Sequence, residues 1–236
     1  MYKYNLTTMK RTDFDFCLIV VALFAPFVLS PNLYAGYQSF NAEHGMVMSF
    51  LKFAVLSTLG ELLGLRISTG QYLRKGFGVL PRAVVWGVLG MGINLAFIVF
   101  STGVPAAAGY LGVDDPAAIM AGPVTPSKVL LAFAISVSLN SIFAPVFMTF
   151  HKITDTHILA TGGTLRGLFT PIPMGDIMQS LNWRVQWGFV FKKTIPLFWF
   201  PAHTITFLLP GEMRVLFAAL LGVALGVILA VAARKK

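Results

Sequence analysis

Long apolar runs alternate with short polar segments along almost the whole chain. Three runs reach the roughly 20 residues that an α-helix needs to cross a hydrocarbon layer of about 30 Å. They are Met46–Leu65, Ala83–Val104 and Val129–Phe150, and a fourth run, Val215–Ala233, is equally apolar. The pattern therefore predicts an all-α, polytopic bundle with membrane spans over residues 46–65, 83–104, 129–150 and 215–233.

Two further apolar segments are weaker candidates for spans. Residues 16–37 form one only if the helix passes through Pro31, and residues 190–209 contain Pro196 and Pro201. Proline removes a backbone donor and bends a helix. If only one of the two segments crossed, the Lys-rich and Arg-rich loops would no longer all lie on one side of the membrane. We therefore predict that both cross, which gives six spans, and the alternative is that neither crosses, which gives four.

Positive charge sets the orientation, because Lys and Arg collect in the short cytoplasmic loops of membrane proteins. With six spans, 15 of the 18 Lys and Arg residues fall on one side. Only Lys128 and Arg214 fall on the other side, and Lys52 lies inside a span. We therefore predict that both termini are cytoplasmic. The net charge of +9 forms no basic face, so we expect no nucleic-acid partner.

The composition supports this prediction. Hydrophobic residues make up 56% of the 236 residues and charged residues 11%, with a mean hydropathy of +0.77, whereas soluble domains carry about 25% charged residues. We treat residues 1–236 as one transmembrane domain whose main partner is the lipid bilayer. Cys17 is the only cysteine, which excludes an intramolecular disulfide.

A long cytoplasmic segment separates the fourth and fifth predicted spans. Apolar residues recur in it at helical spacing beside two tryptophans: Ile177, Met178, Leu181, Val185, Trp183 and Trp187. We predict an amphipathic helix over residues 175–187 that lies in the membrane interface. A solvated connecting helix is the alternative.

Small residues recur at every fourth position on two spans, a spacing that lets helices pack closely in lipid. One such stripe is Gly60 and Gly64, and the other is Ala218, Gly222, Gly226 and Ala230. We interpret both as packing faces, either inside one chain or at the seam of a homo-oligomer.

Glu61 is the only acidic residue deep inside a predicted span, which makes it a functional candidate. Lys52 lies about half a turn out of phase on the same helix. We therefore expect Glu61 to pair with Asn140, with His203 or with a lysine of another span. A structural hydrogen bond and a place along a solute pathway are both open interpretations.

His203 and Thr206 follow Pro196 and Pro201 in the fifth predicted span, and Pro145 lies in the fourth. A proline frees a backbone carbonyl that needs another partner. Helix kinks at these three prolines, together with a titratable imidazole, are suited to lining an aqueous path. A purely structural histidine is the alternative.

Residues suited to catalysis are scarce. His151, Asp155 and His157 offer part of a metal site, but their spacing fits no established pattern. No serine lies in a nucleophile elbow. We therefore predict a protein that is not an enzyme and that holds no metal and no cofactor, with a membrane-embedded metal enzyme as the second alternative.

Residues 140–147 read Asn-Ser-Ile-Phe-Ala-Pro-Val-Phe. They resemble a Gln-x-x-Phe-Ala-Pro-x-Phe stretch of the 22-kDa peroxisomal membrane protein family, whose Mpv-type members include mitochondrial inner-membrane proteins. Residues 199–202 and 207–214 resemble the Trp-Pro-Ala and Pro-x-x-x-Arg signature of that family. The positions that match its motifs are Lys52, Gly60, Glu61, Phe143, Pro145, Pro201, Pro210 and Arg214.

The resemblance covers about residue 46 to the C-terminus and indicates a distant, bacterial member of the family. Asn140 stands where the family has Gln, and Glu61 stands where it has Asp. It implies a weakly selective channel or transporter for small solutes. A non-conducting membrane scaffold or assembly factor is the first alternative. We expect a bacterial inner membrane, with the mitochondrial inner membrane as the second choice.

Overall fold

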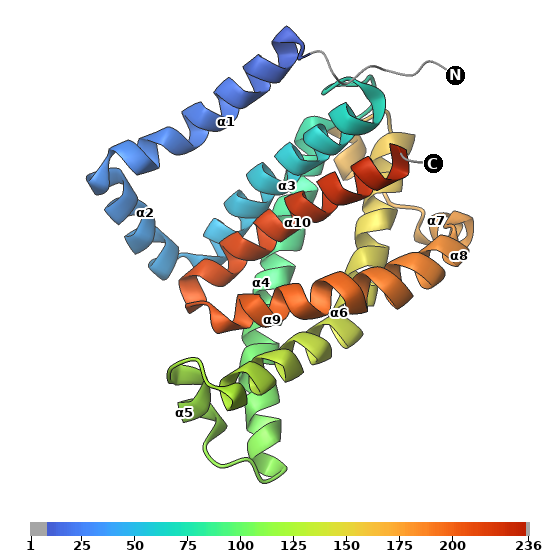
Figure 1. Ribbon diagram of the computed structural model, residues 1–236. Helices are drawn as coiled ribbons and strands as arrows, with labels where there is room; N and C mark the ends of the chain where they lie inside the picture. The colour runs from blue at the N-terminus through green and yellow to red at the C-terminus, as the bar shows by residue number, and fades with distance from the viewer. Residues whose placement is uncertain (1–8, 235–236) are drawn as a thin grey trace.

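The computed structural model describes residues 9–234, and every regular element in that range is helical. Figure 1 shows them as a bundle of long rods with short helices at its ends. The elements are α1 (Arg11–Leu29), α2 (Pro31–Glu43), α3 (Gly45–Thr69), α4 (Val79–Tyr110), α5 (Pro116–Ala121), α6 (Pro126–Ala160), η1 (Arg166–Phe169), α7 (Met174–Ser180), α8 (Trp183–Val185), η2 (Gln186–Trp199), α9 (Phe200–Leu208) and α10 (Gly211–Arg234).

Five of the described helices are long and apolar enough to cross a membrane: α1, α3, α4, α6 and α10. The predicted all-α bundle is thus confirmed, and the chain has the make-up of a multi-pass integral membrane protein. The four strong apolar runs lie within α3, α4, α6 and α10, which extend beyond them. The helices are longer because hydropathy detects only their apolar part, whereas polar first and last turns are helical as well.

The structure corrects the single helix predicted over residues 16–37. α1 ends at Leu29, and α2 begins at Pro31. Ser30 has an extended backbone, and its side chain accepts a hydrogen bond of 3.3 Å from the amide of Leu33. A capping serine followed by proline at the first helical position starts a new helix. The weak first segment is therefore one apolar helix followed by a shorter, more polar one.

The single helix predicted over residues 175–187 is also corrected. α7 ends at Ser180, and the backbone of Leu181 is extended. The side chain of Asn182 then accepts a hydrogen bond of 3.1 Å from the amide of Val185 and caps α8. Ile177 is buried, whereas Trp183 and Trp187 are exposed. The apolar repeat persists across two helices because a capping asparagine interrupts it.

Residues 186–208 are helical without a break, but most of this segment is a π-helix. Pro196 lies inside η2, and Pro201 lies in the first turn of α9. The i→i+5 hydrogen bonds of a π-helix make a turn wider than the 3.6 residues of an α-helix. Pro196 thus lies in a stretch where the helix type changes.

Contacts between helix ends show that α1, α3, α4 and α6 run in alternating directions. Lys10 at the start of α1 donates a hydrogen bond of 3.3 Å to the carbonyl of Gly70 at the end of α3. The loop before α4 meets the loop after α6, where Gly78 and Gly163 both have positive φ angles. A Cβ on Gly163 would lie 2.6 Å from the amide nitrogen of Gly78, so this contact requires glycine.

The C-terminus of α10 lies at the same end of the bundle (Figure 1). We call it the cationic end, because it carries Lys10, Arg66, Arg82, Lys152 and Arg166. The start of α1 and the end of α10 therefore lie at the end of the bundle where these Lys and Arg residues also lie.

The apolar core lies toward the opposite end of the bundle. Its buried members come from five helices: Phe53, Leu56, Ala96, Phe97, Ala132, Ile135, Leu139, Phe207, Val215, Ala218 and Ala219. Four of them have no exposed surface: Ala132, Ile135, Phe207 and Ala219. We call this set the core cluster. It packs the ends of α9 and α10 against the middle of α3, α4 and α6.

α3 and α4 approach each other closely at two glycines. Gly87 and Gly90 are both buried, and a Cβ at Gly90 would lie 2.5 Å from the Cβ of Phe53. Phe53 belongs to the core cluster and is only 3% exposed. Because the clash involves the base of the phenylalanine side chain, rotation of its ring does not relieve it.

Gly90→Ala should lower the free energy of unfolding by about 1–3 kcal/mol, the usual cost of overpacking a core. Gly92→Ala on the same helix is the matched control, because no atom lies within 4 Å of its Cβ position. There the helical preference of alanine should leave stability unchanged or raise it by up to about 1 kcal/mol. Unfolding of the detergent-solubilised protein by a denaturing detergent measures both, and equal effects would contradict the packing.

α1 is held to the bundle mainly through its first turns, and none of its residues is buried. Asp13 forms an ion pair of 2.6 Å with the buried Arg66 of α3. The ring of Phe16 stacks on Tyr72 with 4.6 Å between centroids. Beyond this anchor, α1 presents apolar side chains on all sides, as a helix surrounded by lipid does.

Burial and a hydrogen bond to Asp13 raise the pKa of Tyr72 to about 12. The folded state therefore favours the protonated phenol. The stability that the Tyr72 phenol gives to the contact between α1 and α3 should be fully present below pH ~10, the pKa of an unperturbed tyrosine. This stability should be lost as the pH rises toward 12. Ultraviolet titration of the parent minus Tyr72→Phe isolates this phenol. A pKa near 10 would show that Tyr72 does not pack against Asp13.

Candidate intramembrane cavity

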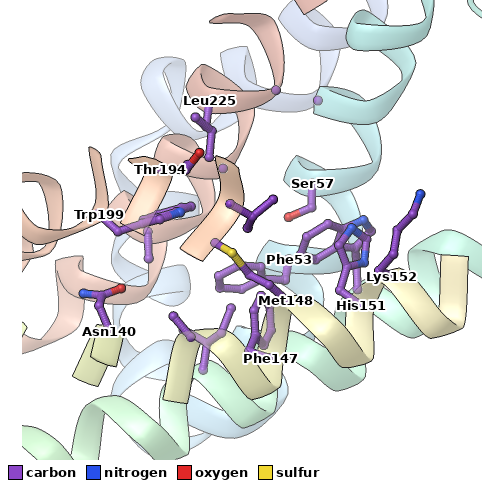
Figure 2. A pocket seen from close by; sticks show the side chains of 18 of the residues that line it. Phe53, Ser57, Asn140, Phe147, Met148, His151, Lys152, Thr194, Trp199 and Leu225 are labelled. Carbon is purple, nitrogen blue, oxygen red and sulfur yellow. The ribbon is translucent and has the colours of Figure 1, made fainter. Parts of the chain in front are cut away.

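A cavity of about 370 Å³ lies between α3, α4, α6, η2, α9 and α10. Figure 2 shows that aromatic and aliphatic side chains, among them Phe53, Phe147 and Leu225, form much of its wall. Glu61, Asn140 and His203 also line it. The structure thus places three of the four polar candidates around one space. Thr206 is fully buried beside it and donates a hydrogen bond of 3.0 Å to the carbonyl of Ala202.

The cavity is closed at one end and open at the other. Toward the core cluster its wall includes Phe97, Leu139 and Ala218. Near the cationic end, its lining includes the exposed residues Lys152, Phe189 and Leu229. Phe189 and Leu229 belong to η2 and α10, which diverge toward that end in Figure 1. The cavity therefore opens sideways between these two helices.

The π-helix gives the cavity one of its walls. Gln186, Val190, Thr194 and Trp199 line the space from η2, at intervals of four, four and five residues. In an α-helix this spacing would turn Trp199 away from Gln186, because each turn takes 3.6 residues. The wider turn of the π-helix keeps all four on one face. Residues of this kind of helix are often found at functional sites.

The predicted glycine stripes pack on each other at one point and widen the cavity at another. A Cβ at Gly60 would lie 3.1 Å from the Cα of Val223, so α3 and α10 are in close contact there. Gly64 and Gly222 line the cavity instead, and nothing lies within 4 Å of their Cβ positions. Side chains at these two positions would project into the open space.

A group of charged residues lies where the cavity meets the cationic end. Arg82 of α4 pairs with Glu61 of α3 at 2.6 Å and also with Asp155 of α6. Glu61 accepts a second hydrogen bond, of 2.9 Å, from Nε1 of Trp86. Lys152 lies 3.6 Å from Asp155. We call Glu61, Arg82, Lys152 and Asp155 the charged cluster.

The partner predicted for Glu61 was therefore wrong, since within residues 9–234 neither Asn140, His203 nor a lysine pairs with it. The apolar run begins at Ala83, which assigns Arg82 to a loop, whereas α4 begins at Val79. Arg82 and Trp86 consequently lie one helical turn apart and face α3 together. A basic residue one position before an apolar run, followed by tryptophan four residues later, is the signal that could have identified them.

The charged cluster is balanced, with two acidic and two basic side chains. Arg82 is 6% exposed, and its Nε also donates to the carbonyl of Phe77 at 2.7 Å. A buried charge of this kind is tolerable only when it is paired and hydrogen-bonded. The ion pairs of the charged cluster therefore hold α3, α4 and α6 together at the cationic end.

Arg82→Met should destabilise the protein by about 3–5 kcal/mol, because it leaves two carboxylates near a low-dielectric interior without their partner. Lys152→Met is the matched control, since its side chain is 54% exposed and its pair with Asp155 contributes at most about 1 kcal/mol. Adding Glu61→Gln to Arg82→Met should restore part of the loss. Detergent-induced unfolding gives all three values, and equal stability of the two single variants would rule out the bridging role of Arg82.

Three polar side chains lie toward the closed end of the cavity, and we call Asn140, Trp199 and His203 the deep polar group. Nδ2 of Asn140 donates a hydrogen bond of 2.8 Å to the carbonyl of Ser136. The indole of Trp199 stacks on the imidazole of His203, with 5.0 Å between ring centroids. Sequence reasoning found Asn140 and His203 but missed Trp199, whose side chain is brought to the cavity by the π-helix.

The remaining family-matched residues serve other contacts. Lys52 is buried and donates to Asn41 of α2, away from the cavity. Arg214 donates a hydrogen bond of 3.1 Å to the carbonyl of Leu209 and so closes the turn at Pro210. Phe143 lines the cavity one turn from Asn140. Phe143 thus belongs to the cavity wall, whereas Lys52 and Arg214 make structural contacts elsewhere.

The three residues considered for a metal site point to different places. His151 lies 3.8 Å from Glu61, and Asp155 pairs with Arg82. His157 turns to the other side of α6, where its Nε2 lies 3.0 Å from the carbonyl of Gly167. Within residues 9–234, no group of three or more His, Cys, Asp or Glu side chains could hold a metal ion.

Comparison with known proteins gives no relative. No protein-family model matches the chain, and no curated protein or solved structure matches it significantly. The resemblance to the 22-kDa peroxisomal membrane protein family thus rests on the motif residues alone.

Proposed function

We propose that this protein is a transporter or gated channel for small uncharged solutes. The cavity between the spanning helices is the observation that supports this function. A bundle that served only as a scaffold would gain stability by filling such a space, because voids in a packed interior cost free energy. Here two glycines, Gly64 and Gly222, keep it open.

The wall of the cavity favours uncharged solutes. Most of its lining is apolar, and transfer of an ion into such surroundings costs far more than transfer of a neutral molecule. The charged cluster offers no net charge to offset that cost, because its two carboxylates are matched by Arg82 and Lys152. A site for an ion would need an excess of one sign.

A cavity closed at one end suits a gated pathway. The core cluster separates the cavity from the far side of the bundle. A solute that crosses requires the helices to separate at the core cluster, while the charged cluster holds the cationic end together. The proposal includes membership of the 22-kDa peroxisomal membrane protein family, since that family includes weakly selective channels. It also includes a place in a bacterial inner membrane.

Filling the cavity should abolish transport. Gly222→Leu adds a side chain into the open space, and the purified variant in liposomes should pass glycerol at the rate of empty liposomes. Glycerol is uncharged and crosses lipid slowly, and its uptake is followed by light scattering as the vesicles swell. The parent should pass it measurably faster. Gly103→Leu is the matched control, because Gly103 is exposed on α4, outside the cavity, with no atom within 4 Å of its Cβ position.

The result that refutes the proposal is glycerol uptake by the parent that equals uptake by empty liposomes, which would favour the non-conducting scaffold. Potassium and chloride currents in planar bilayers provide the second comparison. Ion currents that Gly222→Leu blocks would show that the solutes are charged.

A further inference from the structure

We infer that the deep polar group binds a hydroxyl group of an uncharged solute whose remaining part is apolar. The inference rests on the proposed function and names the class of solute. It follows from the hydrogen-bonding roles of three side chains on the cavity wall.

Trp199 supplies a donor that has no partner. Its Nε1 is buried and makes no hydrogen bond within residues 9–234. The indole lines the cavity, as Figure 2 shows. A buried N–H without an acceptor is costly, and native proteins satisfy nearly all such groups. A solute that brings an acceptor to this position recovers that cost.

His203 supplies an acceptor. Its Nδ1 lies 3.3 Å from the hydroxyl oxygen of Thr206, and that hydroxyl gives its own hydrogen to the carbonyl of Ala202. The oxygen of Thr206 can therefore only accept, so Nδ1 of His203 carries the hydrogen. In a neutral imidazole, the other nitrogen, Nε2, is then an acceptor.

Asn140 supplies a second acceptor. Its Nδ2 donates to the carbonyl and the hydroxyl of Ser136, at 2.8 and 3.3 Å. This leaves Oδ1, which accepts no hydrogen bond from the described part of the chain. The deep polar group thus combines one donor with two acceptors.

A hydroxyl group matches this set, because it accepts one hydrogen bond and donates another. A carboxylate only accepts, and an ammonium group only donates, so each leaves part of the set unmatched and adds a charge in apolar surroundings. Phe143, Phe147 and Leu225 line the cavity nearby and suit the apolar part of the solute. The opening between η2 and α10 carries Phe189 and Leu229 on its rim, so an apolar molecule can enter from the lipid.

Binding of 2-naphthol and naphthalene to the full chain in detergent tests the inference. The two molecules have the same ring system and differ by one hydroxyl group, and both are much smaller than the cavity. The parent should bind 2-naphthol about three- to tenfold more tightly than naphthalene, as expected for a hydrogen-bonded hydroxyl. Ligand fluorescence in equilibrium dialysis against protein-free micelles gives both dissociation constants.

Trp199→Phe should remove this difference, because phenylalanine keeps an aromatic ring but lacks the N–H. Trp187→Phe, the same change at an exposed position outside the cavity, should leave it intact. Asn140→Leu is a second variant, which removes an acceptor and should also weaken binding of 2-naphthol alone. The charged analogues 2-naphthoate and 2-naphthylmethylammonium should bind more weakly than naphthalene.

Equal affinity of the parent for 2-naphthol and naphthalene would overturn the inference and leave the proposed function standing if glycerol still crosses. The same holds if either charged analogue binds most tightly. Absence of binding by all four molecules together with absence of glycerol flux would overturn both. A loss of 2-naphthol preference in Trp187→Phe as well would show that the ligand binds outside the cavity.

Discussion

The pairing of Arg82 with two carboxylates is the interaction on which the architecture depends. A guanidinium that is 6% exposed cannot stay charged among apolar helices unless its partners are fixed beside it. Glu61 comes from α3 and Asp155 from α6, so one side chain of α4 sets how three helices meet at the cationic end. The electrostatic requirement of one buried charge thus fixes the mutual register of these helices.

The charged cluster holds the helices together at the cationic end, and the core cluster holds them together farther along the bundle. The other helices can therefore surround the cavity without closing it. Between these levels, η2 and α10 diverge, and the glycines of α3 and α10 present no side chains to fill the gap. The π-helix adds to this effect, since it aligns Gln186, Thr194 and Trp199 along one wall. The cavity thus lies between two levels of close packing.

Periodicity and hydropathy predicted the four strong helices, because apolar runs of this length are stable only in lipid or in a large core. They failed where local capping decides the structure, as at Ser30 and Asn182, and where helix type changes, as at η2. Glu61 and Asn140 were found because polar residues are rare in spans. Arg82 and Trp199 were not, since a helix start and the face of a π-helix depend on hydrogen bonds that a hydropathy pattern does not contain.

The side on which each loop lies tests the account most directly, because the Arg82 pairing requires the start of α4 and the end of α6 to lie on the same face of the membrane. Cys17, the only cysteine, is replaced by serine, and single cysteines are introduced by Lys75→Cys, Arg166→Cys and Asp114→Cys. A maleimide that cannot cross the membrane should label positions 75 and 166 from the cytoplasmic face and position 114 from the opposite face. Labelling of positions 75 and 166 from opposite faces would contradict the account.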